Sequence, residues 1–310
     1  MSSIPDPILS TESRDLHLST KDIHFARILV GTDFSEPARH ALNLAIAISQ
    51  IFGSELFIVH AVSPFIYGDG QNAMPVEMIT AQLEAAKEEM TNLIASDPRL
   101  TGLKVNTTVA NAEAVALIEQ VAKEQKVDLI VVGSHGASGV ERLILGSAAE
   151  AVLRRASSPV LIVGPNCRVE RHPFRSILFC TDLDVSSLRA AQYASALAEG
   201  SDGRLTLLHV VEGGPATPGA RSDLAESHLQ HQLCSLLPAG ADVFCKPKTR
   251  IEHGSPSQVI TGVAESEAAS LIVVGLRNRS PLADHSPWST LSRVIRDAQC
   301  GVLAVRGRLL

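Results

Sequence analysis

The chain contains two copies of one unit, and this internal repeat constrains the fold more than any other feature. The segment Arg-Ile-Leu-Val-Gly-Thr-Asp at 27–33 returns as Ser-Ile-Leu-Phe-Cys-Thr-Asp at 176–182, and Leu-Ile-Val-Val-Gly at 129–133 returns unchanged at 271–275. Two further pairs match in the same order, 56–62 with 205–211 and 157–163 with 299–305. Matches at the start, middle and end of each copy predict two domains of one fold.

The length of 310 residues also favours two domains over one. The stretch Gly-Pro-Asn-Cys-Arg-Val-Glu-Arg-His-Pro at 164–173 has two prolines and a charge cluster, which is typical of a domain boundary. We expect a disordered polar tail at 1–24, a first domain at 25–165, a linker at 166–174 and a second domain at 175–307. These two domains are called the first and the second half below.

Apolar runs alternate with helical patterns in each copy. In the first copy we expect strands near 28–30, 56–62, 103–109, 127–133 and 159–163, and helices near 36–51, 75–96, 112–125 and 147–156. In the second copy we expect strands near 176–180, 205–211, 242–251, 270–275 and 302–305. Such alternation gives parallel sheets with right-handed crossovers. The expected fold is therefore α/β: two tandem open parallel five-stranded sheets with helices on both faces, of the Rossmann-like kind.

Composition excludes several classes of protein. The chain has 27 Lys and Arg against 33 Asp and Glu, a formal net charge of −6, whereas a nucleic-acid binder needs a basic surface. No run of 18 apolar residues predicts a membrane span, and 1–24 lack the pattern of a signal peptide. The five cysteines contain no C-x-x-C pair, so neither a disulfide framework nor a zinc site is expected. We expect a cytoplasmic protein with reduced thiols.

Two loops of the first half follow strands at the place where open parallel sheets bind ligands. One is Gly31 to Glu36, directly after the first strand, and the other runs from Gly133 through Gly139 to Gly146 and Ser147. Glycine-rich turns with a helix start behind them bind anions through backbone N–H groups. Strand–helix turns also favour Gly and Ser for purely structural reasons, and Ser147 with Glu150 matches a capping box that places Ser147 as the helix cap.

Asp33 decides between simple phosphate and a nucleotide as the expected ligand. A carboxylate beside a phosphate loop repels the ligand unless it accepts hydrogen bonds from a ribose or holds a metal ion. Asp33 with the glycine loop therefore indicates a nucleotide, although Asp33 is equally suited to cap the following helix. Arg142, within the glycine loop, is either a charge-assisted phosphate donor or an exposed loop arginine.

These residues resemble the universal stress protein family. Gly133, Gly136, Gly146 and Ser147 match its nucleotide pattern G-x2-G-x9-G-[S/T]. Thr-Asp-Phe-Ser-Glu at 32–36 and Ser-Ser-Pro-Val-Leu-Ile-Val at 157–163 are also similar to that family, and the likeness covers both copies. The resemblance implies an adenine nucleotide alpha hydrolase-like fold and ATP, with or without Mg²⁺, as the ligand.

The resemblance also implies roles for individual residues. Asp33 meets ribose hydroxyls, the backbone of Ala61 pairs with the adenine edge, and Gly133, His135 and Gly136 form the phosphate loop. The full predicted set is Gly31, Thr32, Asp33, Ala61, Val132, Gly133, His135, Gly136, Arg142, Gly146, Ser147 and Ala148. No catalytic residue and no protein-bound metal are predicted.

The second copy keeps part of this pattern and loses the rest. Asp182, His209 and Gly275 repeat Asp33, His60 and Gly133. In the ungapped register, Gly136 becomes Asn278, Gly146 becomes Trp288 and Ser147 becomes Ser289, with Pro281 and Pro287 nearby. An indole where backbone must touch phosphate blocks the ligand, and proline removes N–H donors. We therefore predict that the second half has lost triphosphate binding, the alternative being that Trp288 stacks on another planar ligand.

Three functions remain open after other motifs are excluded. The chain has no P-loop, no G-x-G-x-x-G after its first strand and no G-x-S-x-G, and His228 with His231 lacks a third metal ligand. The favoured function is an ATP-binding signalling or stress-response module with an unknown protein partner. The alternatives are a weak ATPase or phosphotransferase using the same pocket, and a nucleotide-free structural pseudo-dimer.

The family's usual dimerisation through its last strand implies one more contact. The two copies would pair 160–163 with 302–305 inside one chain, which covers two exposed sheet edges. We therefore expect an intramolecular pseudo-dimer, while association of two chains through helices stays open.

Overall fold

A computed structural model describes residues 23–63, 75–135, 145–213, 220–238, 241, 246–277 and 286–307. The elements of the first half are β1 Arg27–Gly31, α1 Glu36–Phe52, β2 Glu55–Val62, α2 Val76–Ser96, a 3-10 turn Pro98–Leu100, β3 Val105–Asn111, α3 Ala114–Glu124, β4 Leu129–Gly133, α4 Ser147–Arg155 and β5 Val160–Val163. Those of the second half are β6 Ser176–Thr181, a 3-10 turn Val185–Ser187, α5 Leu188–Gly200, β7 Arg204–Val211, α6 Ala220–Ser235, β8 Lys248–His253, α8 Pro256–Ser266, β9 Leu271–Leu276, α9 Ser286–Asp297 and β10 Gly301–Arg306.

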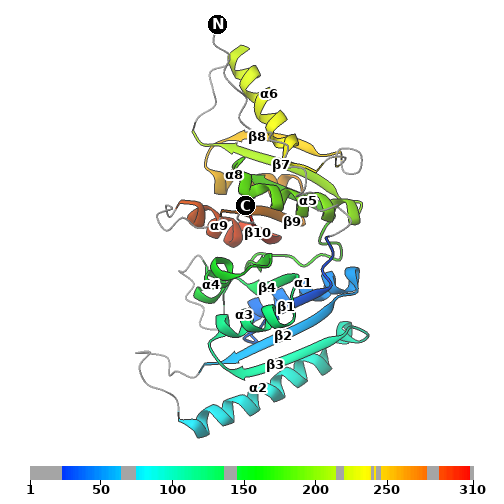
Figure 1. Ribbon diagram of the computed structural model, residues 1–310, viewed down its shortest axis with the longest axis vertical. Helices are drawn as coiled ribbons and strands as arrows, with labels where there is room; N and C mark the ends of the chain where they lie inside the picture. Colours follow the sequence, from blue (N-terminus) through cyan, green and yellow to red (C-terminus); the bar gives the residue numbers. More distant parts are fainter. Residues whose placement is uncertain are drawn as a thin grey trace.

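The strands form one ten-stranded sheet with the order β3-β2-β1-β4-β5-β10-β9-β6-β7-β8. Figure 1 shows this sheet running through the molecule, with β3 and α2 at one end and β8 and α6 at the other. Every neighbouring pair is parallel except β5 and β10, which pair antiparallel through Leu161 with Leu303 and Ile162 with Val302. The predicted pairing of the last strands is therefore confirmed, and it merges the two five-stranded sheets into one.

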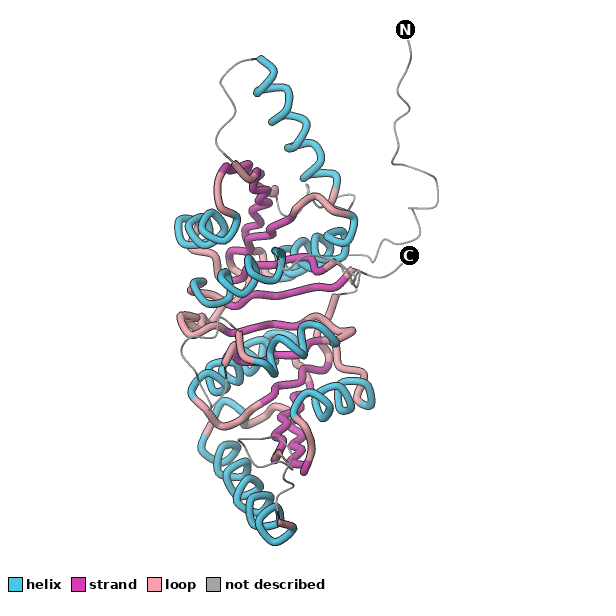
Figure 2. Tube along the Cα trace, turned by 90° about the vertical axis from the view of Figure 1, so that its left-hand side faces the viewer, coloured by secondary structure: helices cyan, strands magenta, loops and turns pink. Residues whose placement is uncertain are grey.

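Helices cover both faces of the sheet, as the α/β prediction requires (Figure 2). One face packs under α1, α2, α5 and α6, whose buried residues share a single apolar core. The other face packs under α3, α4, α8 and α9, which share a second core. Since the strands are buried on both faces, they read as continuous apolar runs such as Ile28, Leu29 and Val30, each 0 % exposed.

Three predicted strands have wrong boundaries, including β4, which begins at Leu129 instead of 127. β3 begins at Val105 and ends at Asn111, two residues later than predicted at both ends. β8 begins at Lys248, whereas the sequence predicted a strand from 242, and 242–245 lie outside the described residues. Lys246 has a φ of 41°, in the left-handed region, and an extended strand cannot continue through that conformation.

Local signals fix both ends of α1 and therefore the loop that precedes it. Ser35 caps the helix and accepts a hydrogen bond from the Ala38 N–H at 3.4 Å, and Pro37 stands in the first turn, where its missing N–H costs nothing. Gly53, with a φ of 66°, ends the helix in the left-handed conformation and donates to Ser49 O. The helix is thereby fixed directly after the loop from Gly31.

Of the cysteines that the structure describes, three lie in the core and one on the surface. Burial raises the pKa of Cys167 and of Cys300 to about 12, and it also raises the pKa of the Cys180 thiol. All three thiols are therefore protonated at pH 8, and only thiolates react readily. We expect iodoacetamide at pH 8 to modify the exposed Cys234 and to leave these three intact until the protein unfolds, as mass spectrometry of the digested protein will measure. Rapid modification of Cys167 or Cys300 in the folded protein would contradict the burial.

Candidate functional site

The sheet order places the switch point of the first half between β1 and β4. Successive strands β1, β2 and β3 extend the sheet in one direction, and β4 then pairs on the opposite side of β1. Ligands of open α/β sheets bind at such a reversal, beyond the carboxyl ends of the strands. β1 and β4 both end here, so the structure brings the described starts of the two predicted loops to one place.

The loop after β1 is held in a fixed conformation. The Thr32 N–H donates to Val59 O in β2 at 2.9 Å, and Nδ1 of His60 lies 2.9 Å from Thr32 O. Phe34 has a φ of 62°, its N–H donates to Thr32 Oγ1 at 3.1 Å, and its ring centroid lies 4.4 Å from that of His60. A non-glycine residue keeps such a conformation only where its surroundings impose it, which is common at binding sites.

Asp33 projects a carboxylate from this loop and does not cap α1. Its Oδ1 accepts hydrogen bonds from the Ser35 N–H at 3.1 Å and from the Ser35 hydroxyl. Ser35 is the capping residue, so the alternative that Asp33 caps the helix was wrong. The half-buried carboxylate is instead oriented at the carboxyl end of β1.

The end of β4 lies against the first turn of α1. A Cβ at Gly133 would meet the backbone carbonyl of Pro37 at 3.0 Å, so this glycine is needed for packing as well as for any ligand. The buried Ser134 donates its N–H to Val163 O at 2.9 Å, and its Oγ lies 2.9 Å from Nδ1 of His135. Gly136 and Arg142, both predicted for the site, lie outside the described residues.

Helix α4 begins beside β4 without a side-chain cap. The Gly146 N–H donates to Ser134 O at 2.7 Å, and a Cβ at Gly146 would approach that oxygen at 3.0 Å. Gly146 is therefore the residue that brings the helix start against the strand end. It is also the N-cap, and as a glycine it gives the first N–H groups of α4 no side-chain cap hydrogen bond.

The predicted capping box at Ser147 was therefore wrong. Ser147 is the first helical residue and is exposed, and Glu150 pairs with Arg154 at 2.7 Å instead of with the helix start. A cap at Ser147 would place the helix start one residue later than the contact between Gly146 and Ser134 O fixes it. Ser147 and Ala148, in the first turn, are exposed, and helix starts are positions at which anions are stabilised.

The remaining predicted residues line the same end of the sheet. Val59 O points toward β1, and residues two apart on a strand point the same way, so the backbone of Ala61 points past the end of β1. Val132 is buried in β4, and a Cβ at Gly31 would meet Ile118 Cδ1 at 3.0 Å. Ala61 is thus placed to contact a ligand, while Gly31 and Val132 shape the strands that carry the loops.

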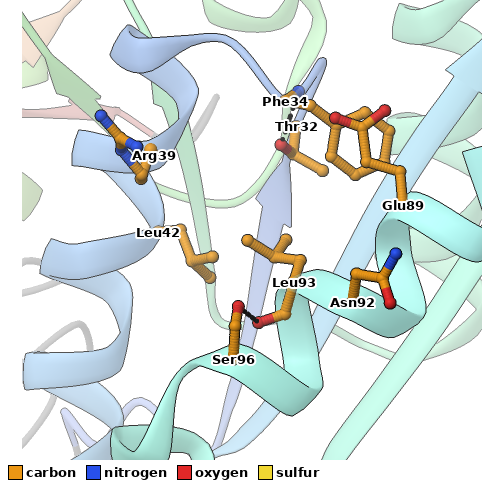
Figure 3. A pocket seen from close by; sticks show the side chains of 8 residues that line it. All are labelled: Thr32, Phe34, Arg39, Leu42, Glu89, Asn92, Leu93 and Ser96. Atoms are coloured by element: carbon orange, nitrogen blue, oxygen red, sulfur yellow. Dashed lines mark hydrogen bonds between the residues drawn. The ribbon is translucent and has the colours of Figure 1, made fainter.

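A separate cavity of about 270 Å³ lies on the other side of the loop after β1. Figure 3 shows Thr32 and Phe34 of that loop facing Leu42 of α1 and Leu93 of α2 across it. Its remaining lining residues are Arg39, Glu89, Asn92 and Ser96. None of the predicted residues of β4 or α4 lines it, so this cavity is distinct from the switch point.

The loop after β6, the first strand of the second half, has the same conformation as the loop after β1, but its aspartate has a different partner. Leu183 has a φ of 64° and donates its N–H to Thr181 Oγ1, and Nδ1 of His209 lies 2.9 Å from Thr181 O, as in the first half. Asp182 accepts two hydrogen bonds from Arg277, from Nε at 3.1 Å and from Nη2 at 2.6 Å. The pKa of the Arg277 guanidinium is raised by its hydrogen bonds to Asp182.

Sequence reasoning missed this ion pair, although the repeat contained its signal. In the register that relates 129–133 to 271–275, Arg277 stands where the first half has His135. An arginine at this position reaches Asp182, which corresponds to Asp33 at the switch point of the first half. The side chains of Arg277 and Asp182 are 60 % and 51 % exposed. The ion pair therefore engages the Asp182 carboxylate, but solvent weakens it.

Helix α9 also starts differently from α4. In the same register Ser147 corresponds to Ser289, but α9 begins at Ser286, three residues earlier. Trp288 therefore lies within the first turn of α9, whereas the corresponding Gly146 is the N-cap of α4. The side chain of Trp288 is outside the described part of the structure. The helix start of the second half is thus displaced by about 4.5 Å along its axis.

Comparison with known families identifies both halves. The family model described as "Universal stress protein family" matches residues 24–164 and 173–306. The chain belongs to the universal stress protein family. A universal stress protein of Mycolicibacterium smegmatis is 24% identical over 291 residues, covering 91% of this chain and 97% of its own.

A solved member of the family has the same fold. A universal stress protein from Archaeoglobus fulgidus has a TM-score of 0.68 at 19% identity, covering 92% of this chain and all of its own. Another universal stress protein, solved in complex with cAMP, is 28% identical and covers 46% of this chain and 98% of its own, with a TM-score of 0.32. In the described part of this chain, no helix is long and apolar enough to cross a bilayer.

Proposed function

We propose that the first half binds ATP at the switch point, with the triphosphate at the start of α4 and the ribose at Asp33. The observation that carries this proposal is the uncapped first turn of α4, which Gly146 and Ser134 O place beside the end of β4. A helix start of this kind offers unsatisfied N–H groups and about half a positive charge. A triphosphate is the ligand chemistry that uses both.

Each other predicted residue has a role in this proposal. The Asp33 carboxylate accepts from ribose hydroxyls, and the backbone of Ala61 pairs with the adenine edge past the end of β1. The N–H groups of Ser147 and Ala148 bind the terminal phosphates. Gly136 and Arg142, in the loop between β4 and α4, contact the phosphates as well, and Mg²⁺ accompanies ATP as its counter-ion.

The proposed activity is binding, which changes the surface that the protein offers to a partner. Efficient phosphoryl transfer needs a positioned base and cations on the developing charge. Near the switch point, the described residues supply the carboxylate of Asp33, already bonded by Ser35, and the imidazole of His135, beside Ser134 Oγ. These groups can recognise a nucleotide, and they give no separate support to ATP hydrolysis.

The decisive experiment looks for the nucleotide in the purified protein. The protein is denatured, and its supernatant is chromatographed against ATP, ADP, AMP and cAMP standards. Nucleotide-free protein is then titrated calorimetrically with ATP and Mg²⁺, and with cAMP and GTP as competitors. Saturable ATP binding with one site per chain supports the proposal, and no bound nucleotide together with no heat of binding would refute it.

Substitution of Asp33 tests the ribose contact. Asp33→Asn keeps an oxygen for the Ser35 N–H but loses the charge, and we expect ATP to bind about fivefold more weakly, since hydrogen bonds to charged groups exceed neutral ones by about 1 kcal/mol. The wild type is expected to prefer ATP over 2′,3′-dideoxy-ATP, and the variant to lose much of that preference. Calorimetry measures both ratios.

Asp182→Asn is the matched control, because Asp182 is the same residue of the second half and is already paired with Arg277. We expect its ATP affinity to equal that of the wild type. Equal weakening by the two substitutions would contradict the assignment of the site to the first half.

A further inference from the structure

Arg306, the last residue of β10, links the second half to the helix of the proposed site. Its Nη2 donates to Leu153 O at 2.6 Å and to Arg154 O at 3.2 Å. Both carbonyl groups belong to the last turn of α4, in the first half. A residue of one half therefore binds the end of a helix of the other.

These contacts matter because α4 is short. The helix has nine residues, and the last carbonyls of any helix have no partner within it. Val152 O accepts from the Ala156 N–H at 2.8 Å, and Arg306 serves the next two carbonyls. A cation at this end also interacts favourably with the helix dipole. Isolated helices of this length are marginal. Packing of the buried Ala149, Val152 and Leu153 holds α4 in place, and the contacts with Arg306 add to this by completing its last turn.

The opposite end of the same helix carries the proposed phosphate site. Gly146 and Ser147 start α4 at the switch point, about two turns from the carbonyls that Arg306 binds. Arg306 Nη1 also donates to Arg277 O at 3.3 Å, and Arg277 is the residue that pairs with Asp182. Arg306 thus connects the altered loop of the second half to the phosphate-binding helix of the first.

The contact has no equivalent on the other side of the junction. In the repeat register Arg306 corresponds to Gly164, and Leu153 corresponds to Ile295. A Cβ at Gly164 would lie 2.0 Å from Ile295 O, so no side chain fits there. The end of α9 is bound instead by Asn166, whose Nδ2 donates to Arg296 O at 2.9 Å. The strands at the junction are paired symmetrically, but the helix ends are not bound symmetrically.

We infer that Arg306 is a positioning residue of the nucleotide site, through which the second half sets the affinity of the first half for ATP. The inference rests on the proposed function. Arg306 touches no ligand; it fixes the far end of α4 and so keeps the N–H groups of its first turn aligned on the phosphates. The second half, altered at its own site, is thereby a structural part of the site in the first half.

The test compares Arg306→Ala, Arg306→Lys and Asn166→Ala by calorimetric titration with ATP and Mg²⁺. We expect Arg306→Ala to weaken ATP binding about fivefold, the size of one favourable helix-end interaction. Arg306→Lys, which keeps a cation able to reach one carbonyl, is expected to recover part of the affinity. Asn166→Ala removes the helix-end contact of α9 across the same junction and is expected to bind ATP like the wild type.

Hydrogen exchange of α4 gives a second measurement that general loss of stability would not reproduce. In the wild type, ATP is expected to slow exchange along the whole of α4. In Arg306→Ala, or in Arg306→Lys if the alanine variant does not fold, the last turn is expected to stay fast with ATP bound. Unchanged affinity and protection in the Arg306 variants, or equal weakening by Asn166→Ala, would overturn the inference. A wild type that binds no nucleotide would overturn the proposed function itself.

Discussion

Gly146→Trp is expected to weaken ATP binding by the first half about a hundredfold. Gly146 caps α4, and even a Cβ there would approach Ser134 O at 3.0 Å and the Cα of His135 at 3.4 Å. The indole would displace the helix start from β4 and cover the N–H groups of its first turn. Losing two hydrogen bonds to a charged ligand, at about 1.5 kcal/mol each, corresponds to this factor. Calorimetric titration with ATP and Mg²⁺ measures it.

The second half supplies the control for this substitution. Trp288 occupies the position that corresponds to Gly146, within the first turn of α9. Trp288→Ala is expected to leave the ATP affinity and the number of sites per chain unchanged, because Arg277 still pairs with Asp182 and α9 still starts early. Undiminished ATP binding by Gly146→Trp, with the fold intact by circular dichroism, would contradict the site. A second ATP bound in Trp288→Ala would show that the indole alone had closed the second half.

Most of the fold could be predicted from the repeat, because strand and helix patterns confirm one another when they occur twice. The pairing of β5 with β10 was also predicted, from the resemblance to a family that usually dimerises through its last strand, and it covers two sheet edges within one chain. The start of β8 could not, because the left-handed conformation of Lys246 leaves no mark on the apolar pattern.

The candidate site was predictable only in part. The sequence placed Asp33 and Gly146 near one another, because both follow strands that flank the switch point. It assigned the cap of α4 to Ser147, since a serine three residues before a glutamate matches the capping pattern. The tertiary contact of Gly146 with Ser134 O decides the helix start instead. A contact between segments this far apart in the sequence is invisible to a local pattern.

The site of the second half shows the same limit. Trp288, together with Pro281 and Pro287, predicted loss of triphosphate binding through a blocked backbone and missing N–H donors. The structure adds a different feature in its described part: Arg277 donates both Nε and Nη2 to Asp182. Which carboxylate an arginine chooses depends on where the sheet places its neighbours, so the ion pair follows from the fold and not from the motif.

Leu161→Ala is expected to lower the free energy of unfolding by about 3 kcal/mol, the usual cost of emptying a buried leucine site. Leu161 is 1 % exposed, pairs with Leu303 across the junction, and has its Cδ1 3.0 Å from where a Cβ of Gly301 would lie. Because β5 and β10 share one core, the loss affects both halves. Guanidinium unfolding followed by circular dichroism is expected to show a single transition at a lower midpoint.

A control variant and a double variant test whether the loss of stability arises at the junction of β5 and β10 or within the core of one half. Ile51→Ala removes a side chain that is 46 % exposed on α1, and its effect is expected to stay within about 0.5 kcal/mol. Leu161→Ala with Leu303→Ala is expected to cost about 1 kcal/mol less than the sum of the single variants, because directly paired residues of neighbouring strands interact. Strict additivity, or a transition that splits into a shifted and an unshifted step, would mean that the two halves unfold independently despite sharing one sheet.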